Sequence, residues 1–549
     1  MKAVVMVVVV MVAVVGAALI TAPDNTNLNT PKTMDYQPQQ IHIAVGDTNT
    51  AMVVTWVTLD NTTTPSVQYG VEGFTREVEG ATRLFKNWDL ERRKVWIHRV
   101  TLKDLKPDTR YVYRCGSSYG WSAAFTFKTW KAGTDWPVSV AMYGDMGADN
   151  AQSLPRLQLE TQDGMYDAVI HVGDFAYDMH TDGGRVGDAF MREIQSIAAY
   201  VPYMTCPGNH EEYFNFSNYR ARFSMPRHED TESMFFSWDM GPVHFIAVNT
   251  EAYYFLQYGM KPLSRQYQWL VEDLEAATRP EVRAERPWII LFGHRPMYCS
   301  NNDKDDCTKE NCRTRVGLPL IHAPATQSSP HCLRYAMEPL LDQYGVDLAV
   351  WAHEHSYERL WPMYNFTVLN GSMEEPYTNP RGPVHLTTGS AGCREIHDHF
   401  VPEQPYWSAL RSIDYGYTRL TAHNNTHLYW EQVSDDKCEC TAASDTQRHI
   451  LTLALQHQTP DPTLQHQTPS TAASDTQHCS IRHPAPHSHP CTAASDTQHC
   501  SIRHPAPLLS PLHCSIRHQH CSIRHPAHTL TLALQHQTPG ATLSPFKVE

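Results

Sequence analysis

Short runs of alternating apolar and polar residues occupy the chain from residue 38 to residue 128. Apolar residues recur at every second position or in brief stretches in QIHIAV, AMVVTWVT, WIHRVTL and YVYRCG, and turns rich in Asp, Asn, Pro and Gly separate these runs. A period of two between such turns is typical of β-strands, and a helical period is missing here. The pattern predicts a β-sandwich of roughly seven strands that carries no evident chemistry.

A different pattern begins near residue 136 and continues to residue 437. Apolar runs end in polar clusters, and helix-like stretches such as SRQYQWLVEDLEAATR lie between several of them. Buried strands that alternate with helices predict an α/β layer architecture, in which reactive groups gather at the carboxyl ends of strands. The runs that end on polar residues include VSVAMYGDMG, AVIHVGDFAYD, YMTCPGNHE, WIILFGHRP and DLAVWAHEHSYER.

The first 22 residues have the pattern of a secretory signal peptide. Lys2 precedes eighteen uncharged apolar or Gly residues, and the small residues Gly16–Ala18 lie near the end of this stretch. A retained membrane anchor is the alternative, because eighteen apolar residues nearly suffice to span a bilayer. We expect a secreted, extracellular or lumenal (lysosome-like) protein that is free of the membrane after signal removal. Candidate glycosylation sites fit that compartment and lie at Asn61, Asn215, Asn365, Asn370 and Asn424.

The composition changes at residue 438, and the chain is repetitive from there to residue 549. TAASDTQ occurs three times, HCSIRH four times and LTLALQHQTP twice, and Phe546 is the only aromatic residue of this tail. Without large apolar side chains at a regular period, burial cannot offset the entropy of ordering, so we expect disorder. Metal scavenging by its Cys and His residues is the alternative, which the irregular spacing of the HCSIRH units disfavours.

Charge and composition exclude one class of partner and favour one kind of chemistry. Lys and Arg number 44 against 58 Asp and Glu, which gives a formal net charge of −14. Nucleic acid is therefore not expected as a partner, because phosphate backbones are held by surplus Lys and Arg. Even without the tail, 17 of the 32 His and 7 of the 14 Cys remain. These residues point to metal chemistry and to an oxidising compartment.

Candidate metal ligands follow the predicted strands of the region 136–437. Each alone is weak evidence, because an Asp after a strand is commonly a cap and a lone His is more often a packing residue. Together, oxygen donors and imidazoles at strand ends are what two adjacent metal ions need, and one carboxylate can bridge both ions. The candidates are Asp145, Asp174, Tyr177, Asn209, His210, His294, His353 and His355.

Five sequence blocks in order, GDMG, GDFAY, GNHE, GHRP and AHEH, resemble the metal-binding blocks of the purple acid phosphatases, within the calcineurin-like metallophosphoesterases. The sequence is most similar to the high-molecular-weight, plant-like type found in animals. This resemblance implies two domains: a fibronectin type III-like N-terminal β-sandwich (38–128) and a metallophosphoesterase β-sandwich flanked by helices (136–437). The fold class of the whole chain would then be α+β or α/β. The phrase LKPDTRYVYRC also resembles a fibronectin type III corner, in which a Tyr bonds back to the turn.

The resemblance also implies a cofactor, namely Fe(III) plus a divalent ion that is Fe, Zn or Mn. A phenolate and carboxylates are hard donors suited to Fe(III), and a neutral amide with imidazoles suits a divalent ion. Phenolate-to-iron charge transfer would colour the protein. The implied ligands are Asp145, Tyr177 and His355 for the ferric ion and Asn209, His294 and His353 for the divalent ion, with Asp174 as the bridge.

The activity implied is that of an acid phosphatase that hydrolyses phosphate monoesters of small molecules or proteins. Metal-bound hydroxide would be the nucleophile, and His210 would be the catalytic acid that protonates the leaving alkoxide. A structural role is the alternative for His210. The alternative functions are a dinuclear phosphodiesterase or nucleotidase, which Tyr177 disfavours, and an inactive binding protein if the altered C-terminus prevents folding. A homodimer is one option for the assembly, because family members of this size are often dimers.

The sequence departs from the family pattern at three places. Ala352 stands where the last block usually begins with Gly, and we expect tolerance because Ala is small. A further His that plant members carry downstream of the His294 position is missing, because YCSNNDKDDC follows. The family's next strand would come after SDDK, where the tail begins instead, and an exposed sheet edge there would cost stability.

The seven cysteines before the tail are an odd number, so at least one stays unpaired. Four of them cluster in a polar insertion after His294, and we expect two disulfides there in pairs that the sequence does not define. A zinc knuckle is the alternative. The cluster consists of Cys299, Cys307, Cys312 and Cys332.

Overall fold

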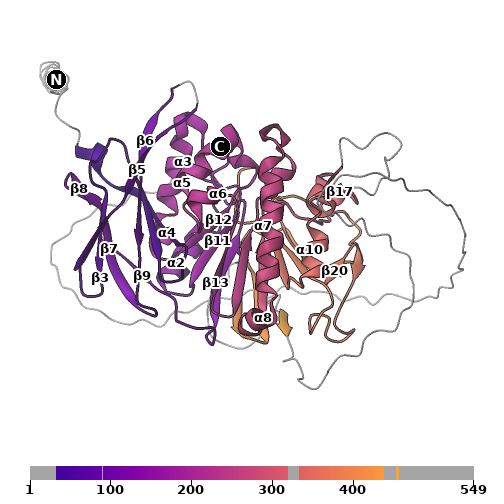
Figure 1. Cartoon of the computed structure of the whole chain (residues 1–549). Coiled ribbons are helices and arrows are strands. Elements are labelled where there is room, and N and C mark those ends of the chain that lie inside the picture. Colours follow the sequence, from indigo (N-terminus) through magenta and orange to yellow (C-terminus); the bar gives the residue numbers. More distant parts are fainter. Residues whose placement is uncertain (1–32, 89–90, 320–332, 438–452, 457–549) are drawn as a thin grey trace, which may run out of the picture. The chain divides into compact units, whose positions relative to one another are not determined.

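The computed structural model describes residues 33–88, 91–319, 333–437 and 453–456 (Figure 1). The signal peptide expected over residues 1–22 and nearly all of the repeat tail lie outside these residues. Among the helices of the described segments, none combines the length and the apolar character needed to cross a membrane.

The N-terminal region is a sandwich of two antiparallel sheets. One sheet has the strand order β1-β2-β6-β5, and the other has the order β4-β3-β7-β8 with β9 also paired to β7. Over residues 33–88 and 91–128, nine strands form where roughly seven were predicted, and β8 has only two residues. The elements are η1 (Thr33–Tyr36), β1 (Gln39–Val45), β2 (Met52–Thr58), β3 (Ser66–Gly70), β4 (Arg76–Glu79), β5 (Ala81–Lys86), β6 (Lys94–Leu102), β7 (Arg110–Ser117), β8 (Gly120–Trp121) and β9 (Phe125–Lys128).

Large side chains from both sheets fill the sandwich. Trp56, Tyr113 and Phe127 are buried in one cluster, as the alternating pattern predicted. The hydroxyl of Tyr111 accepts a hydrogen bond of 2.9 Å from the backbone amide of Lys106. This is the bond back to the turn that the resemblance implied, whereas the assignment of the whole region to the fibronectin type III fold stays a prediction.

The region from residue 138 contains two mixed sheets. The first sheet has the order β12-β11-β10-β24-β25-β26, and its strands β10, β11 and β12 are parallel. The second sheet has the order β13-β14-β15-β18-β22-β19-β23, and its strands β14, β15, β18 and β22 are parallel. The strands are β10 (Val138–Tyr143), β11 (Ala168–Val172), β12 (Tyr203–Cys206), β13 (Phe236–Met240), β14 (Val243–Ala247), β15 (Trp288–Phe292), β18 (Leu348–Trp351), β19 (Tyr357–Leu360), β22 (Val384–Thr388), β23 (Ser408–Ser412), β24 (Gly416–Asn424), β25 (His427–Ser434) and β26 (Leu453–Gln456).

Helices and two small hairpins connect these strands. The mixed α/β class expected for this region is therefore confirmed. The remaining elements are α2 (Leu154–Gln162), α3 (Thr181–Glu193), α4 (Gln195–Ala198), η2 (Asn209–Glu211), α5 (Tyr213–Arg222), α6 (His228–Thr231), η3 (Thr250–Tyr253), η4 (Leu256–Tyr258), α7 (Lys261–Ala277), α8 (Pro280–Glu285), η5 (Asp306–Thr308), α9 (Arg313–Val316), β16 (Leu318–Pro319), β17 (Leu333–Arg334), α10 (Glu338–Gln343), β20 (Met363–Tyr364) and β21 (Thr367–Val368).

Successive residues of the central strands face two different cores. Phe245 of β14 belongs to a cluster shared by the two sheets, whereas the next residue, Ile246, belongs to the cluster that includes α7. Helix α7 contributes Leu263, Leu270 and Leu274 to that second cluster, a spacing that keeps them on one helix face. Figure 1 shows α7 beside the strands of this sheet. The two cores fix the strand ends from which the site is built.

The edge strand of the first sheet comes from the repeat tail. Strand β26 pairs antiparallel with β25, and Trp430 lies opposite Leu453. The sequence led us to expect no strand after β25, and this expectation is wrong for the four residues of β26. The rest of the tail lies outside the described residues.

Candidate metal centre

Loops at the carboxyl ends of parallel strands carry all eight candidate residues. Parallel strands end at the same edge of their sheet, so the loops that follow them gather there. Asp145 follows β10, Asp174 and Tyr177 follow β11, Asn209 and His210 begin η2 after β12, His294 follows β15, and His353 and His355 follow β18.

The backbone of these loops adopts the left-handed conformation at several candidate ligands. Residues other than Gly avoid this region, and each such residue costs on the order of 1–3 kcal/mol, which the surrounding structure must offset. Such strain is concentrated at functional sites. The φ angles are 58° at Asp145, 49° at Asp174, 52° at Tyr177 and 72° at His353.

One group of ligands forms around the phenol of Tyr177. Its oxygen lies 2.7 Å from His355 Nε2 and 3.3 Å from Asp145 Oδ1. His355 Nε2 lies 3.6 Å from the same carboxylate oxygen of Asp145. All three side chains are buried. The structure thus brings together the three residues for which the resemblance implied a ferric ion.

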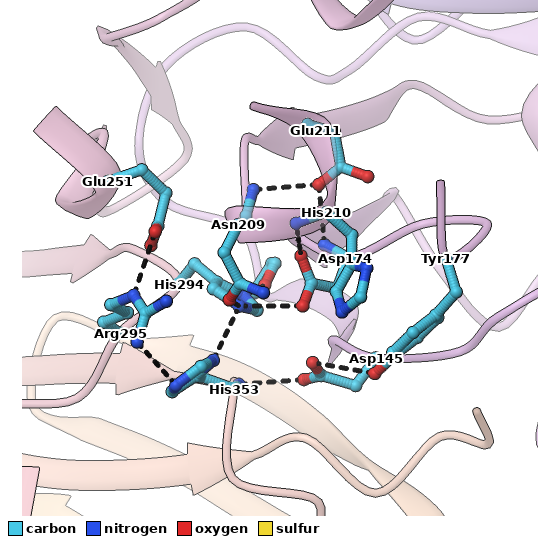
Figure 2. Close-up of polar contacts among 12 residues, drawn as sticks. Asp145, Asp174, Tyr177, Asn209, His210, Glu211, Glu251, His294, Arg295 and His353 are labelled. Atoms are coloured by element: carbon cyan, nitrogen blue, oxygen red, sulfur yellow. Dashed lines mark hydrogen bonds and ion pairs between the residues drawn. The ribbon is translucent and has the colours of Figure 1, made fainter. Parts of the chain in front are cut away.

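A second group forms around the imidazole of His294. Its Nε2 lies 3.1 Å from Asn209 Oδ1, 3.2 Å from His353 Nδ1 and 3.2 Å from Asp174 Oδ2. In Figure 2 the carboxylate of Asp174 lies between this group and the group around Tyr177. The arrangement matches the bridging position that the resemblance implied for Asp174.

Hydrogen bonds orient the three imidazoles toward these groups. In His294 and His355 the nitrogen that faces away contacts a carbonyl oxygen, which favours a proton on that nitrogen and leaves the lone pair of the other nitrogen for a metal ion. In His353 the nitrogen that faces away contacts both a carboxylate and the guanidinium of Arg295, and the other nitrogen faces His294. The donor set therefore fits two metal ions. The contacts are His294 Nδ1 with Val172 O at 2.9 Å, His355 Nδ1 with Ile396 O at 2.9 Å, and His353 Nε2 with Asp305 Oδ2 at 2.5 Å.

The electrostatic field of the site favours positive charge. Burial lowers the pKa of His294, but the charges of Asp174 and Asp145 outweigh burial and raise this pKa to about 10. Burial also lowers the pKa of His355, while the hydrogen bonds with Asp145 and Cys393 raise it to about 12. Bound cations would supply the positive charge that these buried carboxylates attract.

His210 lies at the margin of the site, and one carboxylate orients its ring. Nδ1 lies 3.0 Å from Asp178 Oδ1, and Nε2 lies 3.8 Å from Glu395 Oε2. Burial lowers the pKa of His210, but the hydrogen bond with Asp178 and the charges of Asp174 and Asp178 raise it to about 9. At acid pH the ring is therefore an imidazolium.

Glu211, the residue after His210, fastens two ligand-bearing loops. Its buried carboxylate accepts hydrogen bonds from the backbone amides of Asp174 at 2.9 Å, Phe175 at 3.1 Å and Gly208 at 2.9 Å. Asp174 Oδ1 in turn accepts a hydrogen bond of 2.9 Å from the amide of His210. Glu211 therefore positions the bridging candidate rather than a substrate.

Among the site residues that were not singled out from the sequence, two contact His353. Arg295 belongs to the GHRP block, donates to Glu251 Oε2 at 2.9 Å and lies 2.8 Å from His353 (Figure 2). Asp305 comes from YCSNNDKDDC, the segment in which the family's further His is missing, and it contacts His353 instead. The Asp-rich composition of that segment was the available signal.

Four of the candidate ligands, Asp174, Asn209, His353 and His355, line a pocket with a volume of about 380 Å³. Carboxylates dominate its wall, so the pocket is acidic apart from its imidazoles and one guanidinium. The lining residues are Asp174, Asn209, His210, Arg295, Asp303, Asp305, His353, Glu354, His355, Glu395 and Asp398.

The departure at Ala352 has a packing explanation. A Cβ placed on Gly144 would come within 2.3 Å of the Ala352 Cβ, so the two positions are in close contact. A methyl group is accommodated at residue 352 because its neighbour at residue 144 has no side chain.

The cysteine cluster forms one of its two expected disulfides among the described residues. Cys299 and Cys307 are bonded, and Cys312 has a free, buried thiol. Cys332 lies outside the described residues. A zinc knuckle of four cysteines is wrong, because the disulfide withdraws two of the four sulfurs.

Comparison with known proteins identifies the class of this fold and site. Residues 138–357 match the family model of the calcineurin-like phosphoesterases. Residues 38–129 match the N-terminal domain of the purple acid phosphatases, and residues 382–441 match the C-terminal model of iron/zinc purple acid phosphatase-like proteins. The chain therefore belongs to the purple acid phosphatase family.

Relatives named as acid phosphatases agree with this assignment. The chain is 55% identical to acid phosphatase type 7 of Danio rerio over 73% of its own length and 89% of that protein. It is 52% identical to acid phosphatase type 7 of Homo sapiens over 73% and 88% of the two chains. The purple acid phosphatase PPD1 from yellow lupin (Lupinus luteus) seeds superimposes with a TM-score of 0.59 at 26% identity, over 73% of each chain. The expectation of an acid phosphatase with a dinuclear metal site is confirmed at the level of the family.

Proposed function

We propose that this protein is a secreted acid phosphatase that hydrolyses phosphate monoesters with an Fe(III)–M(II) centre, M being Fe, Zn or Mn. The observation that carries the proposal is the pair of ligand groups around Tyr177 and His294, with Asp174 between them (Figure 2). The family assignment supports the reaction class. The phenol, which only one group contains, supports a difference between the two ions.

The types of donor atom support a separate place for each ion. Asp145, Tyr177 and His355 would hold Fe(III), because the group includes two anionic oxygen donors. Asn209, His294 and His353 would hold the divalent ion, because the group is neutral. When bound, the two ions would supply Lewis-acid activation of the ester and of a water molecule.

His210 holds the proton that the leaving group needs. Asp178 accepts a hydrogen bond from Nδ1, so Nε2–H is free to donate toward the pocket that the ring lines. The raised pKa keeps this proton in place at acid pH, as a general acid requires. Arg295 adds the positive charge of a guanidinium that does not deprotonate, and this charge would attract the phosphate group of a small molecule or protein.

The test of the proposal is the colour, metal content and activity of the full-length protein purified from an iron-supplemented secretory host. We expect two metal ions per chain, a visible phenolate–iron absorption band, and hydrolysis of an aryl phosphate at acid pH. Tyr177→Phe keeps the ring but should lose the band. A colourless, metal-free and inactive wild type contradicts the proposal. A preference for diesters over monoesters would favour the phosphodiesterase alternative instead.

The secreted location is part of the proposal. The Cys299–Cys307 disulfide supports an oxidising compartment, and four of the five candidate glycosylation sites are exposed, namely Asn61, Asn215, Asn365 and Asn424. Expression in cultured animal cells should deliver the protein to the medium with a new N-terminus near residue 23 and with glycans that a glycosidase removes. Retention in the membrane fraction with an intact N-terminus would instead indicate an anchor.

A further inference from the structure

A cluster of carboxylates lies in the pocket wall next to the candidate ligands but includes none of them. Asp303, Glu354 and Asp398 each offer one oxygen within 4.8 Å of the others. They come from three separate segments, namely the insertion after β15, the turn between β18 and β19, and the loop after β22. Three like charges at this distance repel one another unless positive charge lies among them.

The carboxylate of Glu354 is the decisive member of the cluster. Its side chain is completely buried, and among the described residues no hydrogen-bond partner reaches its Oε2. Its Oε1 lies 2.9 Å from the sulfur of Cys307, but that sulfur is bonded to Cys299 and carries no proton. A buried carboxylate without a hydrogen-bond donor lowers the stability of the folded state, so binding of a cation or a proton to Glu354 would stabilise the fold.

The partners of Asp303 and Asp398 leave room for a ligand. Asp303 is exposed, and its Oδ1 accepts a hydrogen bond of 3.0 Å from the amide of Asp305. Asp398 Oδ2 accepts one of 2.7 Å from the amide of His355. Each residue therefore keeps a second carboxylate oxygen, and these bonds hold both side chains at the pocket wall. Because Asp303 is exposed, water can complete a coordination shell.

We propose that Asp303, Glu354 and Asp398 bind a hard divalent cation, Ca²⁺, beside the dinuclear centre. Carboxylate oxygens from irregular loops are the ligands that Ca²⁺ accepts in flexible geometry, whereas Zn²⁺ prefers nitrogen and sulfur. The site uses none of the seven residues assigned to the two phosphatase metals. A cation here also offsets part of the acidic wall that a negatively charged phosphate ester must approach.

The experiment is a calorimetric titration of Ca²⁺ into the full-length protein that already contains its two phosphatase metals, at neutral pH. We expect one equivalent to bind with a Kd on the order of 10⁻⁴–10⁻³ M, the range of exposed extracellular calcium sites. Glu354→Gln and Asp303→Asn should each abolish the saturable heat. Glu374→Gln makes the same charge change at an exposed position and should leave it intact.

Two results would overturn the site. One is a titration in which the wild type shows no saturable heat of Ca²⁺ binding, or in which Glu354→Gln and Asp303→Asn both show the same heat as the wild type. The other is an infrared band of a protonated carboxyl group that persists in the presence of Ca²⁺ and disappears in Glu354→Gln, which would show that Glu354 and Asp303 share a proton instead. Asp303→Asn decides the outcome if Glu354→Gln fails to retain the phosphatase metals, because Asp303 is exposed and is not adjacent in sequence to a candidate ligand.

Discussion

The proton on His210 links the electrostatics of single residues to turnover. The ring is partly enclosed between Tyr177, at 4.5 Å between ring centroids, and the carboxylate of Asp178. Its packing therefore fixes the direction of Nε2, and its carboxylate neighbours keep the proton. Tyr177 is the only candidate ligand whose side chain takes part in these two contacts. Replacement of His210 should therefore leave the candidate ligands in place.

Replacement of His210 should separate metal binding from catalysis. We expect His210→Ala to retain both metals and the visible band but to lower kcat by about 10²–10⁴-fold, the usual contribution of a general acid. Metal analysis and steady-state kinetics on an aryl phosphate measure the two effects. His423→Ala, at an exposed position of β24, is the matched control and should be neutral. Unchanged kcat in His210→Ala would leave the ring with a structural role only.

Asp178 should set the pH at which activity is lost. In the proposed mechanism the active form of His210 is protonated, so activity should fall as the pH rises through its pKa, which the hydrogen bond with Asp178 helps to raise to about 9. Asp178→Asn removes the negative charge, lowers that pKa, and should move the alkaline limb of the kcat/KM profile to lower pH. A limb that stays at the same pH in this variant would assign it to another group.

Asp174 should be indispensable for the whole centre. Its carboxylate contacts His294 and lies between the two ligand groups, so its loss removes a donor that both ions share. We expect Asp174→Ala to lose both metals, the colour and the activity, measured by elemental analysis and absorption. Asp135→Ala, an exposed acidic position, should lose none of them. Retention of one full equivalent of iron in Asp174→Ala would contradict a bridge.

The sequence predicted the candidate metal ligands better than the residues that orient them. Asp145 and His294 could be found because each follows an apolar run, and the strand order then brings the runs to one edge. Asp305 could not be found in this way, since it lies in an irregular segment whose contacts depend on tertiary structure. Asp178 ends the run AVIHVGDFAYD, but its contact with His210 also depends on tertiary structure. The orienting role of Glu211 was also undetermined, because its partners are backbone amides, which leave no pattern in the sequence.

Elements with a long, regular pattern followed the sequence closely. The stretch SRQYQWLVEDLEAATR lies almost entirely within α7, whose buried leucines face the second sheet. Two-residue strands such as β8, β16 and β20 have no pattern long enough to detect, and tertiary contacts decide them. Strand β26 was missed because its four residues belong to a repeat whose composition predicts disorder. Its pairing depends on the free edge of β25, which a local pattern does not show.

Helix α7 should contribute stability without contributing chemistry. Leu270 is 1% exposed within the cluster behind the second sheet. Leu270→Ala removes buried methyl groups and leaves a cavity, so we expect a loss of about 2–5 kcal/mol in the free energy of unfolding. Thermal unfolding measures the loss, and kcat per bound metal at low temperature should stay unchanged. Leu159→Ala on the exposed face of α2 is the control, with a change within about 0.5 kcal/mol.

On the scale of the whole molecule, the candidate metal site draws on both sheets, whereas the described part of the tail, β26, lies at an edge of one sheet. The ligands come from loops after β10, β11 and β12 in the first sheet and after β15 and β18 in the second. Strand β26 lies at the far end of the first sheet, separated from β10 by β24 and β25. Strand β26, the described part of the altered C-terminus, therefore lies at a sheet edge away from the loops that carry the candidate ligands, which favours an active enzyme over an inactive binding protein.

Two truncations should separate the edge strand from the rest of the tail. A chain that ends at residue 460 keeps β26 and should match the full-length protein in thermal stability and activity, because the composition after that point predicts no packed core. A chain that ends at residue 437 exposes the backbone of β25 (His427–Ser434), so we expect a lower unfolding temperature and concentration-dependent association, with two metals still bound. Differential scanning calorimetry, light scattering and metal analysis distinguish the two chains. Equal stability of both truncations would show that β26 adds nothing to the sheet, and loss of the metals on truncation at 437 would show that the edge supports the centre after all.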